Sequence, residues 1–440
     1  MPKLIVQQGY YERGEFELKK GETILGRDAS CDIMLPDNQV SRKHARFTYD
    51  GKVCYVEDLG SFNGTFLNWQ PLREKHVLKH LDVLQICKNV FVYNEDDSSN
   101  DNDESLDLDD VARTRTSETF TIDYLRDLMH KIEGNIQKVF KGKSDVVRNV
   151  LVCMLADGHV LLEDAPGVGK SILAQATAKS IQATFRRIQF TPDMLPSDIT
   201  GLTIYNEQMK EFKFVPGPIF GNIILADEIN RTTPRTQSSL LECMNDGIVT
   251  VDGVPHVLPK PFFVIATQNP MHHHGTYPLP EAQLDRFLMR INIGYPDPMT
   301  EKEILASQMS SHPLNSITYV ARALDIVQCS ALVRRVHVAN AIKDYIIQIA
   351  NATREHPALV NGISPRASLA LMRAGQALAA YSGRRYVIPS DIRSLAPYVL
   401  AHRLQLKLRA QADYNDSAQV IEAILHDIPD DLPEDSLKED

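Results

Sequence analysis

The sequence predicts a multidomain protein with an N-terminal all-β sandwich, a central α/β domain built on a parallel sheet, and a C-terminal all-α domain. Residues 1–93 contain short β-prone runs separated by turn signals, which is typical of a sandwich. Short apolar runs alternate with helical segments over residues 120–297, as in a parallel sheet covered by helices. Residues 298–426 show the apolar period of helices, and acidic segments occupy 94–119 and 427–440.

The composition indicates ordinary globular domains. At 440 residues the chain is too long for a single core, and its hydrophobic content is 43%. The formal charge of −10 argues against binding to nucleic acid through phosphate neutralisation. The six cysteines are scattered without a C-x-x-C pair, which predicts reduced thiols. Because the sequence shows neither a signal-peptide core nor an apolar run that would cross a bilayer, we expect a cytoplasmic protein without membrane insertion.

The N-terminal region carries its clearest hairpin signal at Arg46–Val56, where two β-prone runs flank Asp50-Gly51. This dipeptide favours a type I′ turn. Further strands are expected at Glu22–Leu25, Thr65–Leu67, Val83–Ile86 and Val90–Tyr93. Many short strands without a convincing helix predict a β-sandwich.

Three local patterns follow one another in this region: Gly26-Arg27, Ser41-Arg42-Lys43-His44 and Asp58-Leu59-Gly60-Ser61-Phe62-Asn63-Gly64-Thr65. In this order and spacing they resemble the forkhead-associated (FHA) domain, a phosphothreonine-binding sandwich. A phosphate has three acceptor oxygens and roughly −1.5 to −2 charge, so it requires arginine, hydroxyl and amide donors on loops. By the resemblance, His44 braces the loops, and the phosphopeptide is held by Arg27, Ser41, Arg42 and Asn63.

Three substitutions depart from the FHA pattern. Phe62 occupies a place where the family usually has Ser or Thr, and Trp69 and Cys87 replace residues that are often glycines. The alternative to a phosphothreonine reader is therefore a structural sandwich that has lost its ligand.

The segment Asn94–Val111 is rich in Asp, Glu, Ser and Asn and contains no Lys or Arg, which predicts a disordered tether. The next residues, RTRTSETFTID, contain Thr114, Thr116, Thr119 and Thr121. They are either an ordinary linker end or the source of a phosphothreonine that docks on an FHA domain in the same or a neighbouring subunit. Thr119 is the preferred candidate, because Ile122 lies three residues on, where FHA domains often select.

The stretch VLLEDAPGVGKS, Val160–Ser171, passes from an apolar strand through a turn into a helical segment. The N–H groups of such a turn and of the helix N-terminus bind phosphates. Lys170 would reach the outer phosphates of a nucleoside triphosphate and Ser171 would ligate Mg²⁺, although Asp164 replaces the first glycine of G-x-x-x-x-G-K-[ST]. The expected nucleotide-binding loop comprises Asp164, Ala165, Pro166, Gly167, Val168, Gly169, Lys170 and Ser171.

The rest of the central domain is predicted from two kinds of apolar pattern. An amphipathic helix is expected after Asp123, with an apolar face formed by Leu125, Leu128, Met129, Ile132 and Ile136. The other strands of the parallel sheet are expected at Phe185–Phe190, Ile223–Ala226, Phe262–Ala266 and Ile291–Tyr295.

Polar residues follow two of these strands. Asp227 and Glu228 end the run IILADE, and we assign Asp227 to Mg²⁺ and Glu228 to the attacking water of metal-assisted hydrolysis. The next run ends in ATQN, where a polar side chain would orient the water from the far side. Arg286, in EAQLDRF, is either a surface ion-pair partner or an arginine that a neighbouring subunit supplies to the γ-phosphate.

Several segments resemble AAA+ ATPases and, within them, the MoxR family: LLEDAPGVGKS, ADEINRTTPRTQSSLLECM, FFVIATQNP, GTYPLPEAQLDRFLMRI, SPRASLAL and DIRSLAPYVLAHRL. The resemblance implies a ring, expected to be a hexamer, with ATP between subunits. It implies that Asn269 is the first sensor, Arg286 a finger acting in trans and Arg366 the second sensor. Val139 to Gly142 would line the adenine, and a protein with a von Willebrand factor A domain is a candidate partner.

Three further segments carry expectations. LTIYN and EFKFV predict a β-hairpin, which is either an insertion that meets a client at the ring pore or an ordinary surface excursion. His272, His273 and His274 predict a solvated loop rather than a metal site, because adjacent side chains point in different directions. Ser364-Pro365-Arg366 predicts a helix start that places Arg366 towards the nucleotide.

The sequence therefore predicts an ATP-hydrolysing, ring-forming MoxR-type chaperone or remodelling motor that is recruited or regulated through its FHA domain. Expected partners are other copies of the chain and a phosphothreonine-bearing protein or the chain's own phosphorylated linker. The alternative is a phosphorylation-dependent scaffold whose ATP site controls assembly rather than work. The acidic balance and the lack of an obvious helix-turn-helix disfavour a DNA-remodelling machine.

Overall fold

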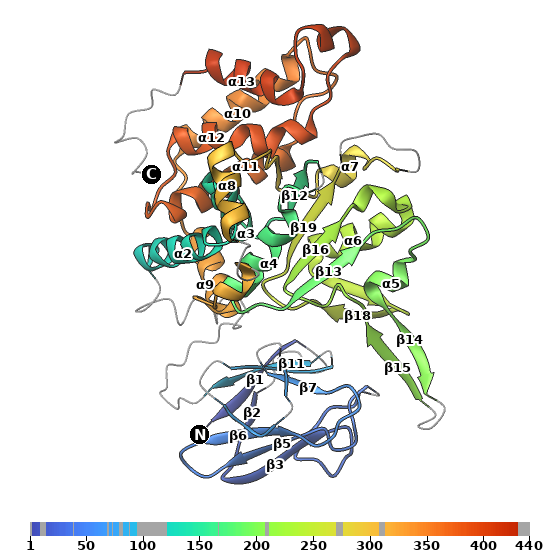
Figure 1. Ribbon diagram of the computed structural model, residues 1–440. Coiled ribbons are helices and arrows are strands. Elements are labelled where there is room, and N and C mark those ends of the chain that lie inside the picture. The colour runs from blue at the N-terminus through green and yellow to red at the C-terminus, as the bar shows by residue number, and fades with distance from the viewer. Residues whose placement is uncertain are drawn as a thin grey trace. The chain divides into compact units, whose positions relative to one another are not determined.

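The computed structural model describes residues 2–8, 15–37, 39–67, 70–72, 74–78, 82–87, 89–94, 121–165, 167–206, 211–269, 276–307 and 313–429. The chain divides into two compact units. The first comprises residues 1–114 with 202–215 and 250–257, and the second comprises residues 115–201, 216–249 and 258–440. Strands build the first unit, whereas a central sheet and many helices build the second (Figure 1).

The N-terminal region is the β-sandwich that the sequence predicts. Its strands are β1 (Lys3–Gln8), β2 (Glu15–Glu17), β3 (Gly21–Gly26), β4 (Ile33–Met34), β5 (Ala45–Tyr49), β6 (Cys54–Asp58), β7 (Thr65–Leu67), β8 (Gln70–Pro71), β9 (His76–Leu78), β10 (Val83–Ile86) and β11 (Asn89–Asn94). One sheet has the order β2-β1-β11-β10-β7-β8, and the other has the order β4-β3-β5-β6-β9. Apolar side chains of both sheets, among them Leu4, Phe47 and Phe91, are buried in one core.

The hairpin between β5 and β6 is present, but the prediction of a two-residue type I′ turn is wrong. Tyr49 pairs with Cys54, so residues 50–53 form a longer loop. The Asp50 carboxylate accepts hydrogen bonds from two backbone N–H groups of this loop, at 2.7 and 2.8 Å. These side chain–backbone bonds stabilise the longer loop.

Two β-hairpins interrupt the central domain: β14 (Gly201–Asn206) with β15 (Glu211–Pro216), and β17 (Ile248–Val251) with β18 (Val254–Val257). The first confirms the predicted hairpin. It carries exposed apolar side chains, including Ile204, Tyr205 and Phe212. The rings of Phe214 and His256 stack with 4.0 Å between their centroids, which joins the two hairpins.

A parallel sheet forms the centre of the second unit. Its strands are β12 (Val160–Glu163), β13 (Phe185–Gln189), β16 (Ile223–Asp227), β19 (Phe263–Gln268) and β20 (Met289–Ile291). Their order is β13-β16-β19-β12-β20, and every neighbouring pair is parallel. The carboxyl ends of all the strands therefore meet at one edge, where ligands of such sheets bind.

The strand predicted at Ile291–Tyr295 is misplaced, because β20 already ends at Ile291. The backbone N–H groups of Ile293 and Gly294 donate to the Asp164 carboxylate. An acceptor side chain from a distant part of the sequence thus replaces the carbonyl groups of a neighbouring strand.

The helices of the central domain are α2 (Ile122–Gln137), α3 (Ser144–Leu155), α4 (Lys170–Ser180), α5 (Pro196–Thr200), the 3-10 helix η2 (Ile229–Arg231), α6 (Pro234–Asp246) and α7 (Glu281–Leu284). The predicted apolar face of α2 is confirmed, since all of its members are buried: Leu125, Leu128, Met129, Ile132 and Ile136. Burial of this face, rather than helix propensity alone, stabilises such a helix.

The all-α domain contains α8 (Pro298–Ser307), η3 (Pro313–Ser316), α9 (Ala323–Val333), α10 (Asn340–Glu355), α11 (Pro365–Tyr381), α12 (Pro389–Leu400), η4 (Ala401–Arg403), η5 (Leu408–Ala412) and α13 (Ser417–Asp427). Helices α10 to α13 gather at one end of the second unit (Figure 1). The start of α11 is as predicted, because the Ser364 hydroxyl accepts a hydrogen bond from Ala367 N at 3.3 Å and Pro365 opens the helix.

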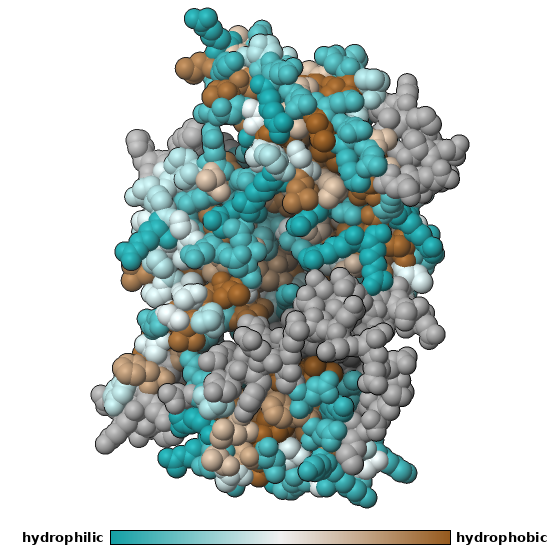
Figure 2. Space-filling view, turned by 180° about the vertical axis from the view of Figure 1, so that it is seen from behind, coloured by the Kyte–Doolittle hydropathy of each residue, from teal (hydrophilic) through white to brown (hydrophobic). Residues whose placement is uncertain are grey.

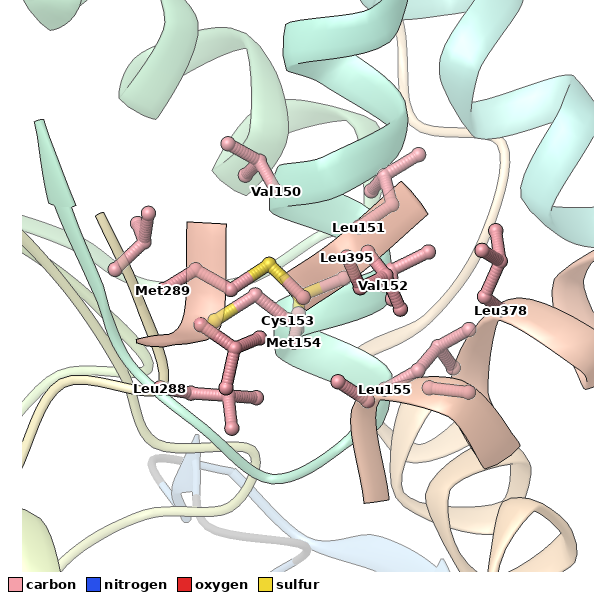
Figure 3. Close-up of a cluster of buried hydrophobic side chains, with 14 of the residues drawn as sticks. Val150, Leu151, Val152, Cys153, Met154, Leu155, Leu288, Met289, Leu378 and Leu395 are labelled. Atoms are coloured by element: carbon pink, nitrogen blue, oxygen red, sulfur yellow. The ribbon is translucent and has the colours of Figure 1, made fainter. Parts of the chain in front are cut away.

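Helix α3 joins the parallel sheet to the all-α domain. Figure 3 shows its last two turns packed with Leu288 and Met289, and with Leu378 of α11 and Leu395 of α12. Apolar residues on all sides of α3 are buried, as expected of a helix inside a core. The sheet and the all-α domain therefore share one hydrophobic core.

Hydrophilic residues cover much of the face seen in Figure 2, with apolar residues singly or in small groups. In the part of the chain that the structure describes, every helix is too short or too polar to cross a bilayer.

Candidate nucleotide and phosphopeptide sites

The phosphate loop, residues 164–169, connects β12 to α4. Gly167 and Gly169 have positive φ values of 90° and 97°, a conformation that favours glycine. A methyl group placed on Gly169 would lie 3.3 Å from the Phe140 ring, whereas one on Gly167 would have no atom within 4 Å. The loop backbone is therefore open at Gly167, as phosphate binding by N–H groups requires.

Lys170, the first residue of α4, lies among acidic groups at the carboxyl edge of the sheet. Its Nζ donates a hydrogen bond to the Asp164 backbone carbonyl at 2.6 Å. Burial lowers the pKa of Lys170, while the charges of Asp164, Asp227, Glu228 and Glu163 oppose that shift. The lysine and the acidic pair that the sequence analysis singled out are therefore neighbours.

Thr267 of β19 links the two acidic residues at the end of β16. Its hydroxyl donates to Asp227 Oδ1 at 2.7 Å and accepts from the Glu228 backbone N–H at 2.9 Å. Glu228 has a positive φ of 58°, a strained conformation of the kind that clusters at functional sites. The threonine thus orients one carboxylate and holds the backbone of the other.

The acidic pair has three further partners that sequence analysis missed. Arg187 Nη2 lies 2.6 Å from Asp227 Oδ2, and Arg231 Nη1 lies 2.8 Å from Glu228 Oε2. Gln189 Nε2 donates to the same Glu228 oxygen at 3.2 Å. Alternation along β13 puts residues 187 and 189 on one face, which is the sequence signal that would have identified them.

The Asp164 carboxylate binds backbone groups of the protein. Its Oδ2 accepts hydrogen bonds from Ile293 N and Gly294 N, the latter at 3.0 Å. The phosphate loop is thereby fastened to the segment that leads from β20 to α8. Asp164, expected from the sequence to be a nucleotide-binding residue, makes this anchoring contact through its side chain.

Asn269 directly follows β19, the strand that lies between β12 and β16. Its backbone carbonyl accepts a hydrogen bond from Asn230 Nδ2 at 3.2 Å. Asn269 therefore stands at the sheet edge between the strand that leads into the phosphate loop and the strand that ends in the acidic pair.

The segment proposed to line the adenine follows α2. Val139 and Phe140 are buried, and Gly142 has a positive φ of 76°. A methyl group on Gly142 would lie 2.6 Å from the Thr300 side chain of α8. This segment thus lies beside the phosphate loop through Phe140 and beside α8 through Gly142.

Arg286 and Arg366 both bind helix α6. Arg286 Nη1 donates to the Leu241 carbonyl at 2.8 Å, and Arg366 Nη2 donates to Asn245 Oδ1 at 2.9 Å. Leu241 and Asn245 are four residues apart and share one face of the helix. The structure therefore brings together two arginines to which the sequence analysis gave separate roles.

The residues at the sheet edge fit a magnesium nucleotide. Ser171 and Asp227 offer oxygen ligands of the kind that Mg²⁺ prefers, and Lys170 and the loop N–H groups offer phosphate donors. Across the described ranges, no three His, Cys, Asp or Glu side chains come together to hold a metal ion.

The four predicted phosphopeptide residues lie on three loops of the sandwich. Backbone hydrogen bonds join the first two loops, from Arg27 N to Ser41 O at 2.9 Å and from Asp28 N to Arg42 O at 3.1 Å. Gly26 is required here, because a Cβ would lie 2.2 Å from the Arg42 carbonyl oxygen. The two arginines and the serine are therefore brought to one end of the sandwich.

The third loop joins this group through Ser41 and Asn63. Ser41 Oγ accepts a hydrogen bond from Phe62 N at 2.9 Å, and Asn63 Nδ2 donates to the Gln39 carbonyl at 2.8 Å. Cys87 Sγ donates to the same carbonyl at 3.0 Å. Cys87 has a positive φ of 55°, a backbone conformation that favours glycine.

His44 has the bracing role that the sequence predicts. It is fully buried, its Nδ1 accepts from Ser41 N at 3.2 Å, and its Nε2 lies 3.1 Å from the Gly64 carbonyl oxygen. Burial lowers the pKa of His44, so the ring is neutral, with its proton on Nε2.

Several predicted features lie outside the described residues: Pro166, the linker residues 95–120 with Thr114, Thr116 and Thr119, the histidines 272–274 and the tail 430–440. Thr121 is described, and its hydroxyl accepts from Tyr124 N at 3.1 Å as the cap of α2.

Three family models match the chain. The ATPase family associated with various cellular activities (AAA) matches residues 159–289, the AAA lid domain matches residues 351–424, and the FHA domain matches residues 23–87. Together with the parallel sheet and the phosphate loop, these matches define an AAA ATPase with an N-terminal FHA domain.

Individual relatives narrow the family. YeaC of Bacillus subtilis (strain 168) is 50% identical over 301 residues, which cover 68% of this chain and 94% of that protein. Chaperone MoxR1 of Mycobacterium tuberculosis is 40% identical over 302 residues, which cover 67% of this chain and 80% of MoxR1. A crystal structure of a protein from Cytophaga hutchinsonii matches with a TM-score of 0.65 and 37% identity, and covers 70% of this chain and 96% of that one. The chain belongs to the MoxR family of AAA ATPases.

Proposed function

We propose that this chain is an ATP-hydrolysing, ring-forming remodelling motor that is recruited or regulated through phosphothreonine recognition by its FHA domain. The observation that carries the proposal is the carboxyl edge of the parallel sheet. There β12 leads through the phosphate loop to Lys170, and β16 ends in Asp227, whose carboxylate accepts a hydrogen bond of 2.7 Å from Thr267 of the strand between them. A phosphate-binding lysine, a carboxylate for the metal and a second carboxylate for water form the set that hydrolysis of a nucleoside triphosphate requires.

Each residue of the nucleotide site has a separate task. Lys170 and the loop N–H groups bind and orient the phosphates. Ser171 and Asp227 would hold Mg²⁺, which supplies neutralisation of the phosphate charge. Glu228 accepts a proton from the attacking water, and Asn269 orients that water from the adjacent strand.

The two arginines that bind α6 support a ring, expected to be a hexamer, in which ATP lies between subunits. Arg286 and Arg366 gather two positive charges on one helix face. An arginine supplied in trans stabilises the charge on the transferred phosphoryl group and is worth about 10³–10⁵ in kcat. Arg286 would then act on the nucleotide of the neighbouring subunit, and Arg366 would be the second sensor.

Phosphothreonine binding is assigned to Arg27, Ser41, Arg42 and Asn63. Hydrogen bonds between the three loops hold the loop backbones and the side chains of Ser41 and Asn63 in place before a ligand binds, which lowers the entropic cost of binding. The ligand would be a phosphothreonine in a partner protein or in the chain's own linker, with Thr119 preferred.

Remodelling of a client is supported by similarity to MoxR1, which is named a chaperone. A protein with a von Willebrand factor A domain is proposed as a further partner.

The variant Glu228→Gln tests the motor against the scaffold. It should lower phosphate release by at least about 10²-fold, because the proton acceptor is lost, while fluorescent ATP still binds. Glu422→Gln, at an exposed position of α13, is the matched control and should leave phosphate release unchanged. A wild-type chain that binds ATP and assembles but releases no phosphate would favour the scaffold.

A further inference from the structure

We propose that Arg403 is a positioning residue for the arginine finger: it reaches from the all-α domain and fixes the segment that carries Arg286. The inference rests on the proposed role of Arg286 at the nucleotide of the neighbouring subunit. It gives a task to a buried arginine that neither the nucleotide site nor the phosphopeptide site uses.

The Arg403 side chain is only 5% exposed and binds both neighbours of the finger. Its Nη1 forms an ion pair with Asp285 Oδ1, and its Nη2 donates to the Phe287 carbonyl at 2.8 Å. The third nitrogen, Nε, donates to the backbone carbonyl of Val399, in the all-α domain, at 2.9 Å. One planar guanidinium thus links α12 to the residues immediately before and after Arg286.

The segment that carries the finger depends on such anchors. Helix α7, Glu281–Leu284, contains no buried residue and is too short to be stable by itself. Arg403 of the all-α domain binds both Asp285 and Phe287. His402 of the same domain also contacts Phe287, with Nε2 3.0 Å from the carbonyl oxygen. Arg286 itself points to α6, so its place depends on the anchored residues on both sides.

The same anchor reaches the second arginine. Asp285 Oδ2 lies 3.7 Å from Arg366 Nη1, so one carboxylate joins Arg403 and Arg366. Leu395 of α12 belongs to the same cluster of buried side chains as Leu288 and Met289, the residues that follow the finger segment (Figure 3). A change at Arg403 would therefore disturb the finger while leaving the phosphate loop and Glu228 of its own subunit in place.

Arg403→Lys is the informative variant, because it keeps the charge and removes the fork that spans both neighbours. Misplacement of a catalytic group by about 1 Å costs about 10²-fold. We therefore expect kcat for ATP to fall about 10- to 100-fold, with KM for ATP within about twofold. Arg384→Lys is the matched control, since Arg384 binds Asp391 through two bonds of 2.6 and 2.7 Å inside the all-α domain; its kcat should stay at the wild-type value.

Mixing variants separates positioning from folding. Full-length Arg403→Lys and Glu228→Gln, each impaired alone, should release phosphate faster when combined than either does alone, because the Glu228→Gln subunit supplies an intact finger to an intact Glu228. Arg286→Ala mixed with Glu228→Gln is the positive control. Circular dichroism and thermal melting report the fold of each variant, so loss of structure is seen separately.

Three results would overturn the inference in distinguishable ways. If Arg286→Ala is rescued by mixing and Arg403→Lys is not, Arg403 is a structural residue and the proposed function stands. If neither is rescued although the wild type is active, Arg286 does not act in trans, and Arg403 has no finger to position. If Arg403→Lys keeps the wild-type kcat, the fork is not needed. A wild type without phosphate release would refute the proposed function itself.

Discussion

Replacing Asp164 tests whether its carboxylate anchors the phosphate loop to the rest of the domain. One oxygen, Oδ2, accepts two backbone N–H groups, from Ile293 and Gly294. A hydrogen bond to a charged group contributes about 1.5–3 kcal/mol, and the half-buried setting argues for the lower end. We therefore expect Asp164→Ala to lower the free energy of unfolding by about 3 kcal/mol, or the melting temperature by about 6 °C.

Asp164→Asn is the matched control, because its amide oxygen still accepts both bonds without the charge. Its free energy of unfolding should be about 1 kcal/mol lower than that of the wild type. Asp164→Gly restores the general phosphate-loop residue, yet it should be no more stable than the alanine variant. Thermal melting of the three variants, with and without Mg·ATP, ranks their stabilities. An alanine variant as stable as the wild type, or an asparagine variant as unstable as alanine, would refute the anchoring role.

Three other predictions follow from single contacts. Thr267→Val removes the hydroxyl that binds Asp227 and the Glu228 N–H, so kcat for ATP should fall about tenfold at unchanged ATP affinity, in a phosphate-release assay. Gly26→Ala places a Cβ 2.2 Å from a backbone oxygen of the adjacent loop, so calorimetry should show at least about tenfold weaker binding of a phosphothreonine peptide, with ATP turnover unchanged. Burial lowers the pKa of His159 to about 4, so the unfolded chain binds the extra proton and stability is lost as pH falls from about 6.5 to 4. This contributes about 3 kcal/mol over that range, and denaturant titrations of His159→Gln should show a correspondingly shallower pH dependence.

Sequence periodicity predicted those elements whose partners are implied by one apolar face. The buried face of α2 and the start of α11 at Ser364 follow from local spacing, and both are confirmed. The end of β20 does not follow from local spacing. The strand is terminated by Asp164, which lies 129 positions before Ile293 in the chain. The loop at Asp50 differs from its prediction for a local reason, since the carboxylate favours a longer turn than the dipeptide suggests.

In the nucleotide site, too, residues in local motifs could be predicted, whereas partners far along the chain could not. Lys170, Asp227 and Glu228 stand in short motifs, so their chemistry can be predicted from adjacent residues in the sequence. Arg187 and Arg403 do not, because each binds a carboxylate far along the chain: the Arg403–Asp285 pair spans 118 positions. Only the folded sheet and the shared core of the two domains bring such partners together.

We propose that ATP is hydrolysed at sites completed by a neighbouring subunit. The most direct test is steady-state phosphate release per subunit, measured with saturating Mg·ATP over a wide range of protein concentration. If the neighbouring subunit completes each site, the rate per subunit should rise steeply as subunits assemble and then reach a plateau. The same rate per subunit at every concentration, including those at which the chain is a monomer, would contradict it.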